Sequence, residues 1–186
     1  MHICLLPAPR EILYLKDAFT FHEGVKILLC GKCGVTDVSA ARILSGVISA
    51  AGKTAPPSIA KTAGGPEKGC CNLIIEDGHA PEEYRLDIMP ERIVIGAATS
   101  RALLYGVRTL QQILEQSGKG APCLSIKDYP DFENRGFYHD ISRGKVPRLE
   151  TMKLLLEKAS RYKLNQVQFY VEIGRASCRE RVYHPV

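Results

Sequence analysis

Hydrophobic and polar residues alternate in several short runs within the first 127 residues, a pattern that predicts half-buried β-strands. We expect strands at residues 2–6, 18–21, 25–30, 72–76, 84–88, 92–95 and 123–126. Residues 36–51 and 99–116 carry apolar side chains three or four positions apart and begin with capping residues, which favours amphipathic helices. Residues 53–69 are rich in proline and glycine and predict a loose surface connection.

The pattern changes after residue 134. Residues 135–142 and 166–171 are typical of strands, and residues 148–162 between them of an amphipathic helix. The helix residues expected to face inward are Leu149, Met152, Leu155, Leu156 and Ala159. Strand, helix and strand with short links form one βαβ unit, which implies parallel strands and a right-handed connection. The expected fold class is α+β, with a mixed sheet-and-helix domain over residues 1–127 followed by this unit in residues 128–172.

Composition and charge exclude several classes of protein. Of the 186 residues, 45% are hydrophobic and 24% charged, a balance that excludes wholesale disorder. The net charge of +5 is too dilute to favour nucleic-acid binding. No apolar run approaches the roughly 20 residues of a membrane span, and the first ten residues do not have the pattern of a signal peptide. We therefore expect a cytoplasmic protein with neither membrane nor nucleic acid as a partner.

The cysteines do not predict a metal or redox site. Cys30 and Cys33 have the spacing of a zinc knuckle, but a four-ligand site needs a second pair, and Cys70 and Cys71 are adjacent. A redox pair is expected at a helix N-terminus, whereas here a strand precedes Cys30. The histidines have no ligand spacing. We expect no metal, no cofactor and free thiols in a reducing compartment.

Charged residues lie within and beside the apolar strand at residues 135–142. Arg135 stands at its start and Asp140 near its end, and burying either charge is costly unless it has a partner. Two interpretations stay open: an ion pair, mutual or with neighbouring residues, that closes the domain junction, or a ligand-binding role. No complete set of catalytic residues occurs in the chain, so no catalytic residue is assigned.

Three motifs are notable in the last part of the chain: IKDYPDFENRG at residues 126–136, DISR at 140–143 and KLN at 163–165. Together they resemble family 20 glycoside hydrolases, the β-N-acetylhexosaminidases. In that family, similar segments lead into the first strand of a TIM barrel, end that strand and precede the second. Upstream, YRL at residues 84–86, LYGVRTLQQ at 104–112 and LLPAP at 5–9 are similar to the α+β domain before the barrel. The resemblance implies a truncated TIM (β/α)8 barrel beginning at residue 128.

The resemblance also implies a reaction and one site residue. It places Arg135 at a position that hydrogen-bonds sugar hydroxyls, and Asp140 and Arg143 at structural positions. The implied activity is retaining hydrolysis of terminal N-acetylhexosamine from glycosides, with the substrate's own 2-acetamido oxygen as nucleophile. The family's catalytic Asp-Glu pair follows the fourth barrel strand and is missing here, so we expect this chain to be inactive. The alternatives are a non-enzymatic α+β module that binds carbohydrate or protein, and a fragment of a neighbouring glycosidase family.

The last residues break the pattern of the chain. Residues 173–182 read IGRASCRERV, without apolar periodicity, and resemble the translation of a common short-read sequencing adapter. We expect residues 173–186 to be non-native and to have no packed role. Glu172 adjoins this segment, so no function is assigned to it.

Overall fold

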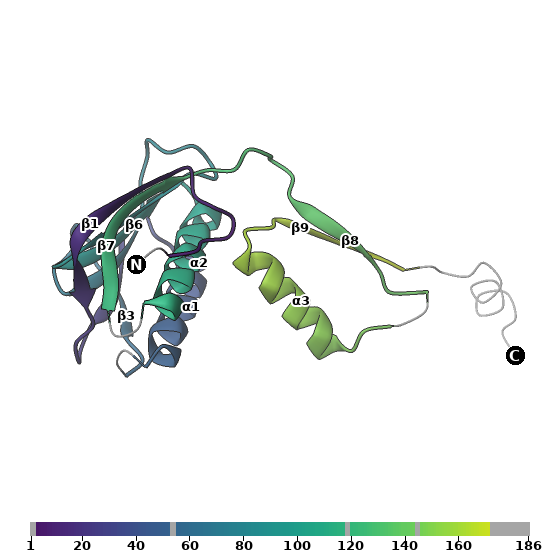
Figure 1. Ribbon diagram of the computed structural model, residues 1–186, viewed down its shortest axis with the longest axis horizontal. Coiled ribbons are helices and arrows are strands. Elements are labelled where there is room, and N and C mark those ends of the chain that lie inside the picture. The colour runs from purple at the N-terminus through teal and green to yellow at the C-terminus, as the bar shows by residue number, and fades with distance from the viewer. Residues whose placement is uncertain (1–2, 53–54, 118–119, 144–145, 172–186) are drawn as a thin grey trace, which may run out of the picture. The chain divides into compact units, whose positions relative to one another are not determined.

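The computed structural model describes residues 3–52, 55–117, 120–143 and 146–171 (Figure 1). The chain divides into two compact units, residues 1–131 and 132–186. The expected non-native tail, residues 173–186, and Glu172 lie outside the described residues.

The first unit is built on a seven-stranded mixed sheet. Its strands are β1 (Glu11–Thr20), β2 (Lys26–Gly31), β3 (Ser58–Lys61), β4 (Cys70–Ile75), β5 (Tyr84–Met89), β6 (Arg92–Ala97) and β7 (Gly120–Asp128). They lie in the order β1-β7-β5-β6-β4-β2-β3. The pairs among β3, β2, β4 and β6 are parallel, and those among β6, β5, β7 and β1 are antiparallel. The strands predicted at residues 84–88 and 92–95 are confirmed, and they form the hairpin β5–β6.

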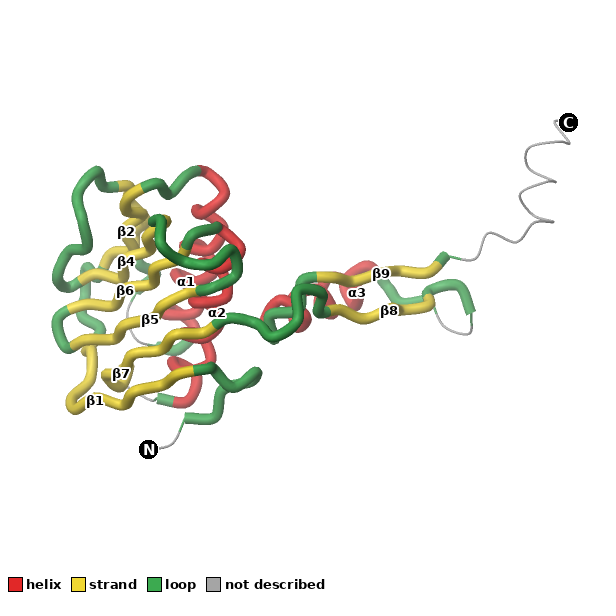
Figure 2. The backbone as a smooth tube through the Cα atoms, turned by 90° about the horizontal axis from the view of Figure 1, so that it is seen from above, coloured by secondary structure: helices red, strands yellow, loops and turns green. Residues whose placement is uncertain are grey.

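Two helices cover one face of this sheet (Figure 2). A 3-10 turn (Val35–Asp37) leads into α1 (Val38–Ala50), and α2 (Ser100–Gln116) begins after Thr99, whose side chain accepts a 3.2 Å hydrogen bond from Ala102 N. Both helices confirm the sequence prediction. Alternate strand residues and the apolar faces of the helices form the main core, because strand side chains change face at every position. The core thus lies between the sheet and the helices.

Gly106 lets α2 approach the sheet closely. A Cβ at this position would overlap Ile95 Cγ2 and lie 3.1 Å from Tyr84 Cδ2, although Gly106 is in the middle of a helix. Glycine weakens a helix, so its presence here is explained by the space that it leaves for β5 and β6.

The other face of the sheet carries a small second core beneath a loop. Leu28, Cys30, Cys70 and Ile74 form this cluster. Asn72 is fully buried beside it and holds the loop: its Oδ1 accepts from Glu67 N at 2.9 Å, and its Nδ2 donates to Glu67 O at 3.0 Å. A fully buried amide needs these partners, and they tie the loop to β4.

Three expectations for the first unit are corrected by the structure. The sequence predicts a loose connection at residues 53–69, but Ser58–Lys61 form β3, an edge strand whose burial is too slight to give a periodic pattern. The strand predicted at residues 18–21 is the end of the longer β1, whose Leu13 and Leu15 are exposed. The described residues 3–6 form no strand, although Ile3 and Leu5 are buried, because their backbone pairs with side chains instead of a neighbouring strand.

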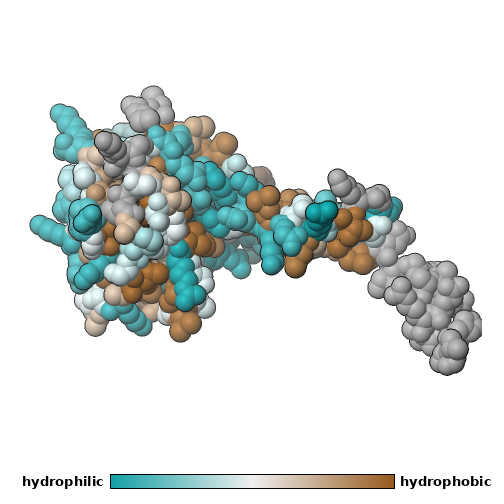
Figure 3. All heavy atoms as spheres, turned by 90° about the horizontal axis from the view of Figure 1, so that it is seen from below, coloured by the Kyte–Doolittle hydropathy of each residue, from teal (hydrophilic) through white to brown (hydrophobic). Residues whose placement is uncertain are grey.

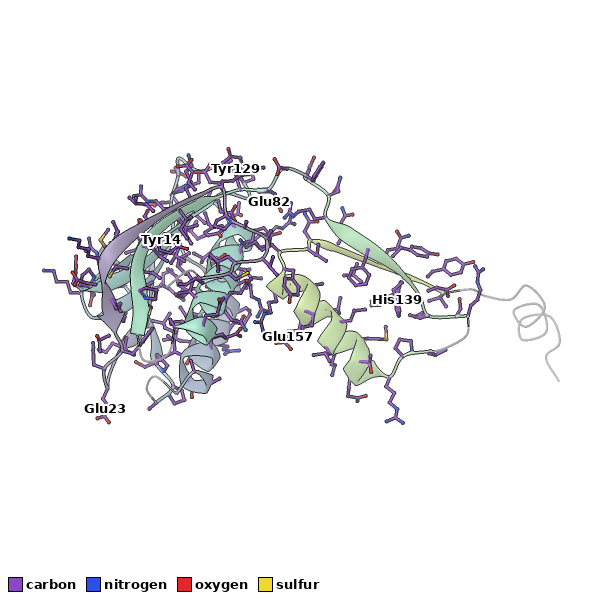
Figure 4. The ribbon with its side chains drawn as sticks, in the orientation of Figure 1. Tyr14, Glu23, Glu82, Tyr129, His139 and Glu157 are labelled. Carbon is purple, nitrogen blue, oxygen red and sulfur yellow. The ribbon has the colours of Figure 1, made fainter. Side chains whose placement is uncertain are left out.

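The second unit contains β8 (Gly136–Asp140), α3 (Leu149–Arg161) and β9 (Gln166–Tyr170). β8 and β9 pair in parallel, with Gly136 opposite Gln166, which confirms the predicted strand-helix-strand order and strand direction. A Cβ on Gly136 would overlap the Gln166 carbonyl oxygen, so a glycine is needed where β9 approaches. Figure 4 labels His139 on β8, whose ring lies edge-on to Phe169 with centroids 6.4 Å apart.

The expected inward face of α3 is only partly buried. Ala159 is buried and Met152 and Leu155 are half-buried, but Leu149 and Leu156 expose 60% and 44% of their surface. Figure 3 shows hydrophobic side chains on the surface of this unit. The prediction of burial is wrong for Leu149 and Leu156, because a two-stranded sheet is too narrow to cover a helix of this length.

No helix among the residues that the structure describes is long and apolar enough to cross a membrane.

We predict that Gly106→Ala destabilises the first unit by about 1–3 kcal/mol, because the added methyl group overpacks the contact with Ile95. Gly46→Ala is the matched control, since Gly46 lies in α1 and no atom beyond its chain neighbours and the backbone of its own helix lies within 4 Å of the point that its Cβ would occupy. The control should stabilise the chain by about 0.5–1 kcal/mol through helix propensity. Denaturant unfolding measures both changes, and equal effects of the two variants would contradict the packing argument.

Candidate functional site

The first unit ends with residues 128–131, which read D-Y-P-D and begin with a buried carboxylate. Asp128, the last residue of β7, is 6% exposed and accepts a 2.9 Å hydrogen bond from the Tyr84 hydroxyl and a 3.3 Å bond from Arg10 N. Tyr84 also hydrogen-bonds Thr109 of α2, at 2.7 Å. Burial and the neighbouring Asp128 raise the pKa of Tyr84 well above its ordinary value, so the hydroxyl stays protonated and donates. This network joins β5, α2 and β7 at the point where the chain leaves the sheet.

Arg10 holds the residues that follow β7. Its guanidinium forms an ion pair with Asp131, donates from Nε to Tyr129 O at 3.3 Å, and lies over the Tyr129 ring, 5.2 Å from the centroid. Figure 4 labels Tyr129 beyond the end of β7. The D-Y-P-D part of the junction motif is therefore anchored to the start of β1, which fixes the path of the chain out of the first unit.

Arg135, the sequence-based candidate for sugar binding, is half-buried just before β8. Its Nε donates to Lys163 O at 3.1 Å, and its Nη1 donates to Phe132 O at 2.6 Å and to Glu133 O at 3.4 Å. These carbonyl groups belong to the segment before β8 and to the turn after α3. The guanidinium thus joins the two chain segments that enter the parallel pair.

The KLN motif forms the other half of this connection. Lys163 is buried and has φ +59°, the left-handed conformation that commonly ends a helix. The Asn165 side chain accepts from Arg135 N at 2.9 Å and donates to Glu133 O at 2.7 Å. The roles of Lys163 and Asn165 were not predicted from the sequence. The KLN motif singles out these residues in the sequence, but only the parallel register of β8 and β9 shows that the motif contacts Arg135.

The DISR motif forms a compact turn at the other end of β8. One Asp140 oxygen accepts from Ser142 N at 2.9 Å, Ser142 Oγ at 3.0 Å and Arg143 N at 3.1 Å, and the other pairs with Arg143 Nε at 3.2 Å. The hydrogen bonds from Ser142, together with those from Arg143, hold the pKa of Asp140 below its ordinary value despite some desolvation. Arg143 also lies over the Tyr170 ring, 5.3 Å from the centroid.

The two interpretations left open for Arg135 and Asp140 can now be weighed. They stand at opposite ends of β8, and the ion pair that Asp140 makes is with Arg143. Neither charge closes the junction by pairing with the other. In parallel α/β sheets, ligands bind outside the carboxyl ends of the strands. Arg143, whose side chain is 66% exposed, lies at the carboxyl end of the parallel strands β8 and β9, whereas Arg135 lies at their amino end. The role of Arg135 in sugar binding stays a prediction.

The structure separates the cysteine pair that has zinc-knuckle spacing. Cys33 packs in the main core and donates to Leu73 O at 3.3 Å, whereas Cys30 belongs to the small core on the opposite face of the sheet. Burial raises the pKa of Cys30 to about 11, which keeps the thiol protonated and unreactive. Among the described residues, no three histidine, cysteine, aspartate or glutamate side chains are grouped to hold a metal ion.

Residues 2–129 match the family model described as glycosyl hydrolase family 20, domain 2. The chain belongs to glycosyl hydrolase family 20. This match covers the whole sheet, α1 and α2, so the resemblance seen in the sequence is confirmed and the first unit is a family 20 domain 2.

Two curated family 20 relatives carry hexosaminidase names. The β-N-acetylhexosaminidase of Cellulomonas fimi is 28% identical over 120 residues, which are 62% of this chain and 24% of that protein. The β-hexosaminidase of Vibrio furnissii is 26% identical over 173 residues, which are 91% of this chain and 26% of that protein. The chain therefore spans about a quarter of the length of these relatives.

Solved structures of family 20 enzymes have the same fold. The exo-β-N-acetylglucosaminidase of Vibrio harveyi, in complex with N-acetylglucosamine, is 25% identical with a TM-score of 0.73, over 89% of this chain and 25% of that one. The N-acetyl-β-hexosaminidase of Streptomyces plicatus has a TM-score of 0.76 at 23% identity, over 90% of this chain and 34% of that one. The second likeness is one of fold alone.

The Asp140 turn should make stability depend on pH. Because the pKa of Asp140 is lower in the folded chain than in the unfolded one, the stabilisation is complete above the unfolded-state value and is lost as the pH falls through the folded-state value. We expect Asp140→Asn to be less stable than wild type at pH 7, and this difference to shrink below about pH 4.

Asp77→Asn is the matched control, since it removes an exposed carboxylate that pairs with exposed Lys32. Denaturant unfolding at pH 7 and pH 3 gives the comparison, in which the control should change little at either pH. A gap between wild type and Asp140→Asn that stays constant over this range would show that the charge of Asp140 does not stabilise the turn.

Proposed function

We propose that this chain is the front part of a β-N-acetylhexosaminidase, and that residues 132–171 form the first βαβ unit of its (β/α)8 barrel. The observation that carries the proposal is a parallel strand pair with an intervening helix directly after a family 20 domain 2. The structural likeness to the Vibrio harveyi enzyme covers 89% of the chain, so it extends beyond the first unit, which ends at residue 131. A barrel strand followed by its helix has this same local arrangement.

The proposed reaction is removal of a terminal N-acetylhexosamine with retention of configuration. The 2-acetamido oxygen of the substrate attacks the anomeric carbon, so the protein supplies a general acid for the leaving oxygen and a group that orients the acetamide. No cofactor takes part. The names of the relatives support this class of substrate.

The 186-residue chain does not contain the residues that this reaction needs. No aspartate is followed directly by glutamate anywhere in its sequence. A complete barrel takes about 250 residues, and the proposed barrel portion here ends by residue 172. We propose that this chain is inactive, and that hydrolysis belongs to a longer parent protein.

Two arginines compete for the role of sugar ligand in that parent. A guanidinium suits vicinal hydroxyls because it presents several donors in a fixed plane and stays charged. Arg135 is the candidate from the sequence, but its Nε and Nη1 donate to backbone carbonyls at the amino end of β8. Arg143 is exposed at the carboxyl end and is held in place by Asp140. The geometry favours Arg143 as the ligand and Arg135 as the residue that joins the strand entries.

Activity is tested with aryl N-acetyl-β-glucosaminide and N-acetyl-β-galactosaminide substrates that release a chromophore. We expect no turnover by the 186-residue chain above buffer, and turnover by the full-length parent on at least one substrate, since only the parent has the acid and the acetamide-orienting group. Turnover by the short chain would refute its assignment as inactive. A folded parent that is inactive on both substrates would refute the reaction.

The two arginines are separated by their effects on binding and stability in the parent. We expect Arg143→Ala to raise KM or lower kcat/KM by at least about tenfold with little change in Tm, because losing a charge-assisted contact costs about 1.5–3 kcal/mol. Arg135→Ala should instead lower the free energy of unfolding by about 1–3 kcal/mol, since the carbonyl groups of Phe132, Glu133 and Lys163 lose a charged donor. Arg42→Ala, an exposed position on α1, is the control and should change neither quantity. The opposite pattern would restore Arg135 as the sugar ligand.

A further inference from the structure

The N-terminal segment is bound to α2 by the side-chain amides of two glutamines. Leu6 N donates to Gln112 Oε1 at 2.9 Å, and Gln112 Nε2 donates to Leu6 O at 2.8 Å. One helical turn further on, Cys4 N donates to Gln116 Oε1 at 3.0 Å, and Gln116 Nε2 donates to Cys4 O at 2.7 Å. Each glutamine thus pairs with a backbone N–H and C=O of the same residue, as the neighbouring strand does in a sheet.

The spacing of these pairs fits an extended chain. Four residues of helix rise about 6 Å, and two residues of an extended strand span about 6.6 Å. Glutamines at positions i and i+4 of a helix therefore match the backbone groups of residues j and j+2 of a strand. The antiparallel run of the two segments follows directly, because the later glutamine, Gln116, binds the earlier residue, Cys4.

The side chains of the same segment alternate between burial and exposure. Ile3 and Leu5 are 8% and 7% exposed and belong to the main core, whereas Cys4 and Leu6 are exposed. Cys4 and Leu6 are bound through their backbone, so specificity for side chains comes from the alternate positions, Ile3 and Leu5. Pro7 and Pro9 follow at once and limit the freedom of the chain beyond the segment.

We propose that this face of α2 is a binding groove for an extended peptide with apolar residues at alternate positions. Its resident occupant is residues 3–6 of this chain, which form a strap. The glutamine amides bind the peptide backbone, and the main core that receives Ile3 and Leu5 selects aliphatic side chains. Because the backbone of Cys4 and Leu6 pairs with side chains of α2 rather than with a strand, the strands of the sheet keep their own pairing when the strap is displaced. The proposal is independent of the proposed hydrolase activity.

The first test uses hydrogen exchange in the intact chain. We expect the Cys4 and Leu6 amides to exchange at least tenfold faster in a Gln112→Leu, Gln116→Leu double variant, while the amides of β5 and β6 keep their rates. Gln111→Leu is the matched control, because Gln111 lies on the same helix and contacts Arg108 and Glu115 rather than the strap. Unchanged exchange at Cys4 and Leu6 in the double variant would overturn the proposal.

The second test supplies the occupant in trans. A fluorescent peptide of residues 3–9, with serine in place of Cys4, is added to the full chain carrying Ile3→Ser and Leu5→Ser, and anisotropy is measured. We expect saturable binding that weakens at least tenfold when the peptide amides at positions 4 and 6 are N-methylated, and again when Gln112 and Gln116 are replaced by leucine. No binding to a folded Ile3→Ser, Leu5→Ser chain, or equal binding of both peptides, would overturn the groove. If circular dichroism shows that this variant does not fold, the exchange experiment decides.

Discussion

Gly106 lets the backbone of α2 lie directly on Ile95 and Tyr84, and two other features of the first unit depend on that close approach. It places Thr109 within 2.7 Å of the Tyr84 hydroxyl, which in turn donates to the buried Asp128. Further along the same helix, Gln112 and Gln116 bind the N-terminal segment. A helix held farther from the sheet would leave the buried Thr109 hydroxyl without its Tyr84 partner, which is a costly state.

Elements with a strong period could be predicted from the sequence, and elements that depend on neighbours could not. The two helices of the first unit, the β5–β6 hairpin and the β8–α3–β9 order follow from residues that repeat at 3.6 or 2 positions. β3 was missed because it is an edge strand with a single half-buried residue, Ile59. The sequence predicts a strand at residues 2–6. Side chains 3–6 do alternate between burial and exposure, but their backbone partners are glutamine side chains that no local pattern reveals.

The charged residues of the second unit show the same limit. Their types and order indicated that they needed partners, and the structure provides partners within a few residues or across a short turn. Asp140 is satisfied by the backbone of Ser142 and Arg143, and Arg135 by the carbonyl groups of Phe132, Glu133 and Lys163. The contact between Arg135 and the Lys163 carbonyl could not be predicted from the sequence, because the two residues are far apart along the chain. They meet only because α3 returns the chain to the start of β8. The alternative of a mutual ion pair fails on geometry, since the strand keeps the two ends apart.

These contacts change what the shared motifs mean. The R-G and K-L-N motifs are joined by backbone hydrogen bonds at the amino end of the parallel pair, so their resemblance to family 20 reflects how the chain folds there. The D-x-S-R motif is different, because it ends a strand at the carboxyl end and leaves an arginine exposed. In parallel α/β folds, side chains at that end contact ligands, while those at the opposite end contribute to stability. A motif can therefore identify a family through residues that join its strands, and the position of a residue along its strand helps to distinguish this role from that of binding a ligand.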